Sequence, residues 1–318
     1  MDKSIKINKV KNTKVNRKPQ NSIPTTAAIC RSAFFLPTIK NKKKIRDRKF
    51  LIKIKEIDYR IKELGISLTE LHNDILEAIL ISKKYIRETK KGFEILYSLH
   101  DIYKTLNKRI SESKIKNKIQ ELRAITYFIE DTQDNFKYLD FNILSGSKLS
   151  GIKYSNGKGM MKGRANYYYQ AIIDKKYLEF TELDLKIFIN EDLLKKIIDL
   201  KSGIVKHLVR YCLSQKELNK DLEDILYEIG VINDETLKQY KYEYKKEILD
   251  NKDIIFNNFG IEIKKMKNGR YGIFYNKINK VYFKNPIQLI EHKQSESYKT
   301  SLLLENNPRN YTTNSQTI

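Results

Sequence analysis

The sequence predicts an α+β fold, mainly helical, built from two consecutive units of the same design. Each half contains a stretch that predicts a short helix, a tight turn and a longer helix with a polar outer face. In each half, alternating apolar and polar residues then predict a β-hairpin. The chain has 318 residues, which suffices for two domains of roughly 100 to 200 residues each. The predicted architecture is therefore two tandem winged-helix domains, each a helix-turn-helix followed by a hairpin wing.

The charge of the chain indicates a polyanionic partner. Lys and Arg number 62 against 39 Asp and Glu, which gives a net charge of +23. An AT-rich genome raises Lys, but it raises Asp and Glu as well, and the acidic residues have not kept pace. The excess favours binding to nucleic acid through release of counterions, although ribosomal and membrane-surface proteins share such a charge.

The cysteine content and hydropathy exclude several other classes. Cys30 and Cys212 lie far apart without a CxxC or Cys/His spacing, so the sequence predicts neither a zinc site nor a disulfide framework. No apolar run approaches the roughly 20 residues that span a bilayer, and the basic start lacks the apolar core of a secretion signal. We expect a cytoplasmic protein that binds no membrane, no metal and no cofactor.

Composition and pattern divide the chain into four predicted segments. Residues 1–28 are polar and basic and predict a disordered arm, and residues 291–318 predict a disordered tail. The first winged-helix domain is predicted at 29–189, with an apolar N-terminal segment, and the second at 190–290.

The first domain is predicted to open with a strand and a long helix. Residues 50–59 alternate in the period of two that is typical of a half-buried strand. Ser67 and Glu70 have the spacing of a capping box, and the apolar period that follows predicts a helix as far as about Arg87. Gly92 then breaks the pattern.

Residues 98–106 and 111–130 predict the first helix-turn-helix. The longer helix has an apolar stripe at Ile115, Ile119 and Leu122. Its opposite face carries the candidate DNA contacts Ser113, Lys114, Lys116, Asn117 and Gln120. The amide side chains on this face could read adenine, and the lysines would bind phosphates.

Residues 138–189 change to a strand-like period and predict strands around a long hairpin. The tip of this predicted wing carries further candidate phosphate contacts at Lys158, Lys162 and Arg164. The stretch GKGMMKGR at 157–164 lacks the spacing of a nucleotide-binding P-loop, so a wing tip is the better interpretation.

The second half repeats the scheme. Helices are predicted at 193–213, 218–229 and 233–249, the last with its core side at Leu237, Tyr244 and Ile248. The outward face of this last helix carries the candidate DNA contacts Lys238, Gln239, Tyr242, Lys245 and Lys246. Segments 260–265 and 270–283 predict the second wing, where Arg270 is a candidate phosphate contact.

No residue pattern predicts catalysis. A nicking enzyme needs paired metal-binding histidines and a nucleophilic tyrosine, but every histidine stands alone, at His72, His100, His207 and His292. Carboxylates are scattered beside lysines and are explained as solvated i,i+4 pairs, with no carboxylate cluster. His207 lies in an apolar helix, which favours a core histidine over a ligand. We therefore expect that the chain is not an enzyme.

Several short blocks resemble the TrfA-type plasmid replication initiators. They cover roughly 29–285 in the order of the family. The blocks are Arg31-Ser32-Ala33 followed by Phe35, the set Gly65, Leu68, Leu71, Asp74 and Ile75, SLHDIYKTL at 98–106, KIKNKIQELR at 114–123, and the later strand pair. From 214 to 285 the match is one of pattern more than of residues, which leaves the base contacts of the second domain open.

The resemblance implies an initiator that binds directly repeated origin sequences, called iterons, and helps to open an adjacent AT-rich segment. It implies double-stranded origin DNA, the host initiator and the replicative helicase as partners. Initiators of this type exchange between homodimer and monomer, and Phe34, Phe35 and Leu36 are the candidate interface.

Other functions remain open at this point. A transcriptional repressor would use the same domains, and only the arrangement of its target sites would distinguish it. A nucleic-acid-cleaving enzyme would show metal-dependent cleavage of supercoiled DNA, and an RNA-binding protein would prefer structured RNA to duplex DNA.

Overall fold

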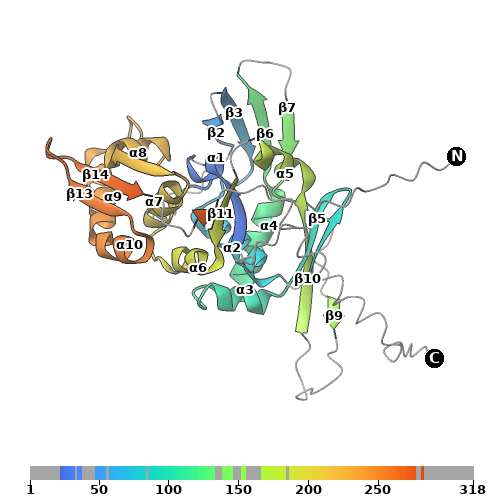
Figure 1. The fold of residues 1–318 in the computed structure, drawn as a ribbon. Coiled ribbons are helices and arrows are strands. Elements are labelled where there is room, and N and C mark those ends of the chain that lie inside the picture. The colour runs from blue at the N-terminus through green and yellow to red at the C-terminus, as the bar shows by residue number, and fades with distance from the viewer. Residues whose placement is uncertain are drawn as a thin grey trace, which may run out of the picture.

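The computed structural model describes residues 22–32, 34–37, 47–54, 57–83, 85–132, 138–145, 152–154, 166–183, 186–276 and 281–282. Helices and strands are interspersed through these residues, and helices take the larger share (Figure 1). The predicted α+β class is therefore confirmed. The candidate contacts Lys158, Lys162 and Arg164 lie outside the described residues, as does the predicted tail at 291–318.

The strands of the first half from β2 onward form two antiparallel sheets (Figure 1). The sheet with the order β2-β3-β6-β7 consists of β2 (Lys49–Ile54), β3 (Ile57–Leu64), β6 (Thr126–Asp131) and β7 (Tyr138–Phe141). The sheet with the order β4-β5-β10-β8, in which β9 also pairs with β10, consists of β4 (Tyr85–Thr89), β5 (Gly92–Tyr97), β8 (Leu144–Ser145), β9 (Ile152–Tyr154) and β10 (Asn166–Asp174). Both sheets contribute side chains to one hydrophobic core, such as Ile61 and Ile95.

The predicted strand at 50–59 is a hairpin of β2 and β3. Within β2 the predicted alternation holds, because Ile52 is buried and Leu51 is exposed. The chain then reverses, so that Ile54 pairs with Ile57. The turn contains neither Gly nor Pro, and the sequence pattern therefore does not mark it.

Helix α2 (Glu70–Ser82) begins and ends differently from the prediction. Its N-cap is Thr69, and His72 completes the capping box, so the predicted box of Ser67 and Glu70 is wrong. The helix ends at Ser82, and Tyr85–Thr89 then form β4 and pair with β5. Gly92 begins β5 with a φ of 129°, and a Cβ atom there would lie 1.9 Å from the carbonyl oxygen of Ile173. Gly92 therefore permits a close approach of two backbones.

Both helices of the predicted first helix-turn-helix are present. Helix α3 (Leu99–Thr105) follows Ser98 as its N-cap. Helix α4 (Glu112–Ala124) follows Ser111, whose hydroxyl accepts a hydrogen bond from the backbone N–H of Lys114. Helix α4 is shorter than predicted because the β-branched and aromatic residues after it form β6.

The N-terminal residues cross to the second half of the chain. Strand β1 (Ser22–Thr26) pairs with β11 (Lys186–Asn190), and β15 (Val281–Tyr282) pairs with the other edge of β11. Residues 22–28 were predicted to belong to the disordered arm, whereas they supply β1 and the start of α1 (Ala27–Cys30).

The apolar N-terminal segment lies inside the core of the first half. The ring of Phe34 stacks on Tyr127 with centroids 4.4 Å apart and lies 5.9 Å from Phe180 of α5 (Lys175–Glu182). Phe34 is 0% exposed and Phe35 is 1% exposed. The expected dimer interface at Phe34, Phe35 and Leu36 is therefore corrected, because its two aromatic side chains already pack within their own chain.

The second half has one further sheet and its own hydrophobic core, which runs from Ile187 to Tyr275. Its helices are α6 (Glu191–Asp199), α7 (Gly203–Leu213), α8 (Leu222–Glu228), α9 (Lys238–Asp250) and α10 (Lys252–Phe259). The sheet has the order β12-β14-β13 and consists of β12 (Glu217–Asp221), β13 (Glu262–Lys265) and β14 (Tyr271–Asn276).

Two predicted helices of the second half are divided by polar caps. The predicted helix at 193–213 is interrupted by Ser202, whose hydroxyl caps α7. The predicted helix at 218–229 begins as β12, and α8 starts only after Asp221, which caps it. Both caps satisfy backbone N–H groups at a helix start. A prediction based on apolar periodicity alone does not detect such caps.

Candidate nucleic-acid interface

Helix α4 presents a polar face to solvent. Ile115, Ile119 and Leu122 are buried as predicted. At 3.6 residues per turn, Asn117 and Gln120 lie on the side opposite this stripe. All the candidate contacts of this helix are exposed, namely Ser113, Lys114, Lys116, Asn117 and Gln120. The neutral polar side chains occupy the centre of the face, and the two lysines lie on its flanks.

A chain of hydrogen bonds fixes α4 against the start of α2. The backbone N–H of Thr69 donates to Nδ1 of His72 at 2.9 Å, so a neutral ring carries its proton on Nε2. That Nε2 donates to Oε2 of Glu121 on α4 at 2.8 Å. Lys118 donates to the same oxygen at 2.6 Å. The capping box of α2 thus also orients α4.

The pKa shifts in this chain agree with its geometry. Burial, together with the charge of Lys118, lowers the pKa of His72 from 6.5 to about 4, against the opposing effect of Glu121. Burial raises the pKa of Glu121, but hydrogen bonds from Lys118 and His72 outweigh it and bring this pKa to about 2. Near neutral pH the contact therefore joins a neutral imidazole donor to a carboxylate.

Helix α9 starts later than predicted. It begins at Lys238, and Leu237, which was predicted to face the core, is its N-cap residue and is 63% exposed. The residues before it form a turn in which the Thr236 hydroxyl donates to the side chain of Asn233 at 2.7 Å. Tyr244 is buried as predicted.

The outer face of α9 is basic and aromatic. Lys238, Gln239 and Lys246 are exposed, and Tyr242 is 68% exposed. Lys245 is half-buried, because its ammonium group pairs with Glu223 of α8. Four of the five candidate contacts on this helix are therefore open to solvent, whereas Lys245 already has an acidic partner.

The turn between β13 and β14 carries a third set of basic side chains, after those of α4 and α9. The backbone N–H of Met266 donates to the carbonyl of Arg270 at 2.7 Å and closes the turn. The guanidinium of Arg270 lies 3.8 Å from Asp221 and remains 68% exposed. Lys265 and Lys267 are exposed beside it. The sequence predicted this hairpin but singled out only Arg270, although the same K-M-K-N-G-R run places the two lysines next to the turn.

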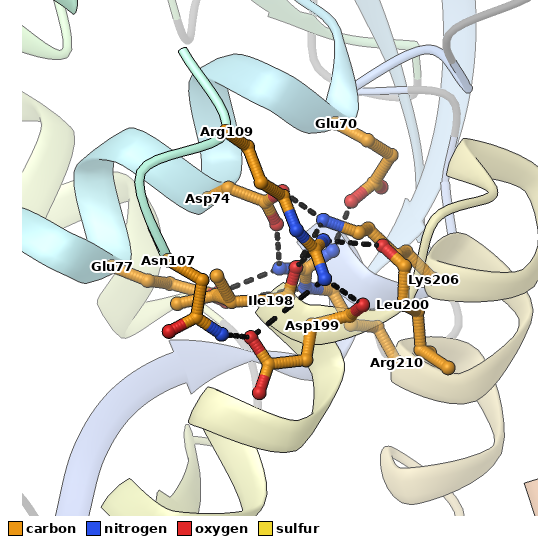
Figure 2. Close-up of polar contacts among 10 residues, drawn as sticks. All are labelled: Glu70, Asp74, Glu77, Asn107, Arg109, Ile198, Asp199, Leu200, Lys206 and Arg210. Atoms are coloured by element: carbon orange, nitrogen blue, oxygen red, sulfur yellow. Dashed lines mark hydrogen bonds and ion pairs between the residues drawn. The ribbon is translucent and has the colours of Figure 1, made fainter. Parts of the chain in front are cut away.

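A buried ionic cluster joins the two halves at α2 and α7 (Figure 2). The guanidinium of Arg210 lies 2.8 Å from Asp74 and 2.6 Å from Glu77, and it also contacts Glu70. Lys206 pairs with Asp74. Nδ1 of His207 lies 2.5 Å from Glu70, so His207 is a buried histidine with a partner, as the sequence predicted.

Charge and burial oppose each other in this ionic cluster. Burial raises the pKa of Glu77, and Arg210 offsets this only in part. Burial acts in the same direction on Glu70, but Arg210 and His207 outweigh it and lower the pKa of that carboxyl. Burial lowers the pKa of Lys206. Each charge depends on its partners, because the surroundings offer little water.

The expectation that the chain has no carboxylate cluster is wrong. The signal was present in the sequence, since Glu70, Asp74 and Glu77 recur at helical spacing on a largely apolar helix. Lys206 and Arg210 recur in the same way on the apolar helix α7. Solvated i,i+4 pairs, which were predicted from the sequence, lie on polar surfaces and not on apolar helices such as these.

A second contact between the halves clamps the turn before α4 to the end of α6 (Figure 2). The guanidinium of Arg109 donates to the carbonyls of Ile198 at 2.6 Å and of Leu200 at 3.0 Å, and also to that of Asp199. The amide of Asn107 donates to the Asp199 carboxylate. Arg109 thus binds carbonyl groups that have no partner within helix α6.

A cavity of about 520 Å³ lies between the halves beside this clamp. Leu71 and Ile110 line it from the first half, and Tyr240, Glu243 and Glu247 line it from α9. The side of α9 that faces the cavity is therefore acidic and aromatic. Its basic side chains lie on the other side of the helix.

The residues that the structure describes contain no group of three or more His, Cys, Asp or Glu placed to hold a metal ion. None of the helices in the described ranges is long and apolar enough to cross a membrane. Cys30 and Cys212 are both buried free thiols, and burial raises the pKa of Cys212.

The fold resembles domains 2 and 3 of RctB. One crystal structure of these domains matches with a TM-score of 0.53 at 10% identity, over 80% of this chain and 99% of that chain. A second one matches with a TM-score of 0.49 at 12% identity, over 83% of this chain and 99% of that chain. The chain therefore shares this two-domain fold over most of its length.

Comparison of the sequence gives no assignment. No protein family and no curated protein matches the chain. The resemblance to the TrfA-type initiators therefore stays a prediction.

Proposed function

We propose that the chain is a replication initiator that binds repeated origin DNA sequence-specifically through two winged-helix domains. The observation that carries the proposal is the exposed face of α4, with amide side chains at its centre and lysines on its flanks. The fold shared with domains 2 and 3 of RctB supports an initiator role. The net charge of +23 supports a duplex DNA partner.

The order of the elements supports a winged helix in the second half. Helix α7 is followed by β12, the helix pair α8 and α9, and the hairpin of β13 and β14, whose sheet has the order β12-β14-β13. In a helix-turn-helix domain the second helix of the pair enters the major groove. That helix is α9, and the turn with Lys267 and Arg270 is the wing that contacts phosphate.

In the first half, α3 and α4 would have the functions that α8 and α9 have in the second, with α4 as the helix in the major groove. Asn117 and Gln120 would each bond an adenine with two hydrogen bonds, and Lys114 and Lys116 would contact phosphates. The wing of this domain is the antiparallel pair of β9 and β10, within the region 138–189 where the sequence predicted a hairpin. The predicted strands of that region are wrong at Lys175–Glu182, which form helix α5.

The two hydrophobic cores support the proposed domain boundaries. The first core draws almost entirely on residues before 181 and the second runs from Ile187 to Tyr275. We place the two domains at 29–189 and 190–290, a boundary that lies just after Ile187 and Ile189, the first residues of the second core.

The remaining steps follow from the resemblance to TrfA-type initiators. The chain would bind iterons, help to open an AT-rich segment in the cytoplasm, and recruit the host initiator and the replicative helicase without chemistry or a cofactor of its own. A monomer–dimer exchange belongs to the same proposal, with an interface other than the buried Phe34 and Phe35.

The test is a salt-series binding assay of the full chain on the direct repeats next to its gene, with a scrambled duplex of equal length as the control. We expect a preference of at least about a thousandfold for the repeats, which is the low end for specific readers. The logarithm of the binding constant should fall linearly with the logarithm of the salt concentration for both duplexes.

Equal binding to both duplexes would overturn the proposal and leave a non-specific basic protein. A preference for a single operator over direct repeats would instead identify a repressor that uses the same surfaces.

A further inference from the structure

The two proposed DNA-reading helices belong to different halves of the chain, yet a continuous set of contacts, partly polar and partly apolar, connects them. We propose that the clamp at Arg109 and the ionic cluster around Arg210 hold α4 and α9 at one fixed separation, so that the chain binds only one spacing between its two half-sites. This inference rests on the proposed function, because it assumes that both helices contact one duplex.

The clamp acts directly on α4. Arg109 lies in the turn just before α4, which begins at Glu112. The turn is tightly defined, since Asn107 and Lys108 both have positive φ angles, of 50° and 58°. A shift of the turn relative to α6 would break the bonds from Arg109 to the carbonyls of Ile198 and Leu200. The start of α4 is therefore held in a fixed position relative to the end of α6.

The connection continues from α6 to α9. Lys206 of α7 donates to the carbonyl of Ile198 at 2.8 Å, on the same helix end that Arg109 binds. Helix α7 packs against α9, and Val205 and Tyr244 belong to the same hydrophobic core. The position of α9 is thereby tied to the helix end that holds α4.

The ionic cluster makes sliding between the halves costly. All its residues are 6% exposed or less, namely Glu70, Asp74, Glu77, Lys206, His207 and Arg210. In such surroundings, separating the guanidinium of Arg210 from its carboxylates leaves charges that water cannot solvate. The clamp and the ionic cluster together therefore give the joint one strongly favoured arrangement.

A rigid joint has a specific consequence on DNA. One turn of duplex spans about 10.5 base pairs, so each inserted base pair rotates the second half-site by about 34° around the helix axis. A chain with a fixed separation loses one of its two contacts when the spacing changes. A chain with a loose joint would tolerate the change.

The experiment compares the wild type with the double variant Arg109→Ala and Asn107→Ala on duplexes whose half-sites are moved apart by one to five base pairs. We expect the wild type to lose at least tenfold in affinity at five base pairs and the double variant to lose threefold or less. Arg60→Ala is the control, because it also removes one cation, from a side chain that is 61% exposed. It should behave as the wild type.

A second measurement tests the joint without DNA. Spin labels at Ala124→Cys and Asp250→Cys, which are exposed positions on α4 and α9, report the distance between the helices by pulsed dipolar spectroscopy. The native Cys30 and Cys212 are buried and should not be labelled. We expect a narrow distribution in the wild type and a broad one in the double variant.

Equally narrow distributions in both proteins would overturn the inference. So would an equal loss of affinity with spacing. If no duplex is bound specifically, the proposed function fails, and with it the inference about spacing; a broadened distribution in the double variant would then still establish the clamp as the joint between the halves.

Discussion

The side chains on the outer face of α4 fall into two chemical groups. Asn117 and Gln120 at the centre both donate and accept hydrogen bonds, which is what an adenine edge requires. Lys114 and Lys116 on the flanks offer only donors and charge, which suits phosphate oxygens. The two groups should therefore give different mutant phenotypes.

Replacing Asn117 with Ala should weaken binding to the repeats by roughly 5- to 150-fold, which corresponds to about 1–3 kcal/mol, and leave binding to scrambled DNA unchanged. Replacing Lys114 with Ala should weaken binding to both duplexes alike and reduce the salt slope by about one. Fluorescence anisotropy titrations over a salt series measure both effects. An equal loss on both duplexes for Asn117→Ala would contradict base reading by this residue.

His72 predicts a dependence of stability on pH. The unfolded ring takes up a proton near its ordinary pKa of 6.5, whereas the folded ring does so only near 4. Between these values the unfolded state binds more protons, so stability falls as the pH is lowered from 6.5 to 4. The contribution is at most about 3 kcal/mol. Glu121, whose folded pKa is about 2 against 4.5, adds a further loss below pH 4.5.

The measurement is urea denaturation of the wild type and the His72→Gln variant at several pH values. The variant should be less stable at pH 7 and should lose less stability on acidification. His100→Gln is the control, because its ring is 58% exposed. A pH profile for His72→Gln that parallels the wild type would show that His72 does not cause the acid loss.

At the scale of elements, the hairpin of β13 and β14 has a stable frame and an exposed basic turn. Residues 262–265 pair with 271–274, and Gly269 has a φ of 82°, which the turn requires. The exposed Lys267 and Arg270 lie in this turn. Changes to them should alter binding without altering folding.

The double variant Lys267→Ala and Arg270→Ala should weaken binding to every duplex and lower the salt slope by about two, with unchanged stability. Binding at several salt concentrations and thermal denaturation measure the two effects. The control is Arg60→Ala with Lys175→Ala, which removes two exposed cations elsewhere. If the control reduces binding as strongly, net charge rather than the turn is responsible.

At the scale of the whole molecule, stability depends on the contact between the halves. Leu80 and Ile81 of α2 pack against both hydrophobic cores. The ionic cluster lies on the same helix and joins it to α7. The two halves should therefore unfold together.

Replacing Arg210 with Met should destabilise the protein by about 3–5 kcal/mol, because Glu70, Asp74 and Glu77 would face one another without a counter-charge. Urea denaturation followed by circular dichroism measures the change. Lys220→Met provides the comparison, since its pair with Glu228 is partly exposed and should contribute no more than about 1 kcal/mol. Similar losses in both variants would argue against a structural role for the ionic cluster.

The sequence by itself determined the features that depend on local spacing. The helix pairs were predicted at 98–130 and 218–249, and the polar face of α4 was identified residue by residue. Helical periodicity and capping act within a few positions of the chain, so they are visible without the fold. The caps at Ser202 and Asp221 are also local, but apolar stripes on both sides obscured them.

Only the tertiary structure decided which distant residues meet. Arg210 and Glu70 are 140 positions apart, and no pattern on either helix predicts that these two residues form a pair. The same holds for Arg109 and the end of α6, and for Phe34, whose apolar character fitted an interface as well as a core. Burial and ion pairing are properties of packed surfaces, and a linear pattern predicts only that a face is apolar or charged, not what covers it.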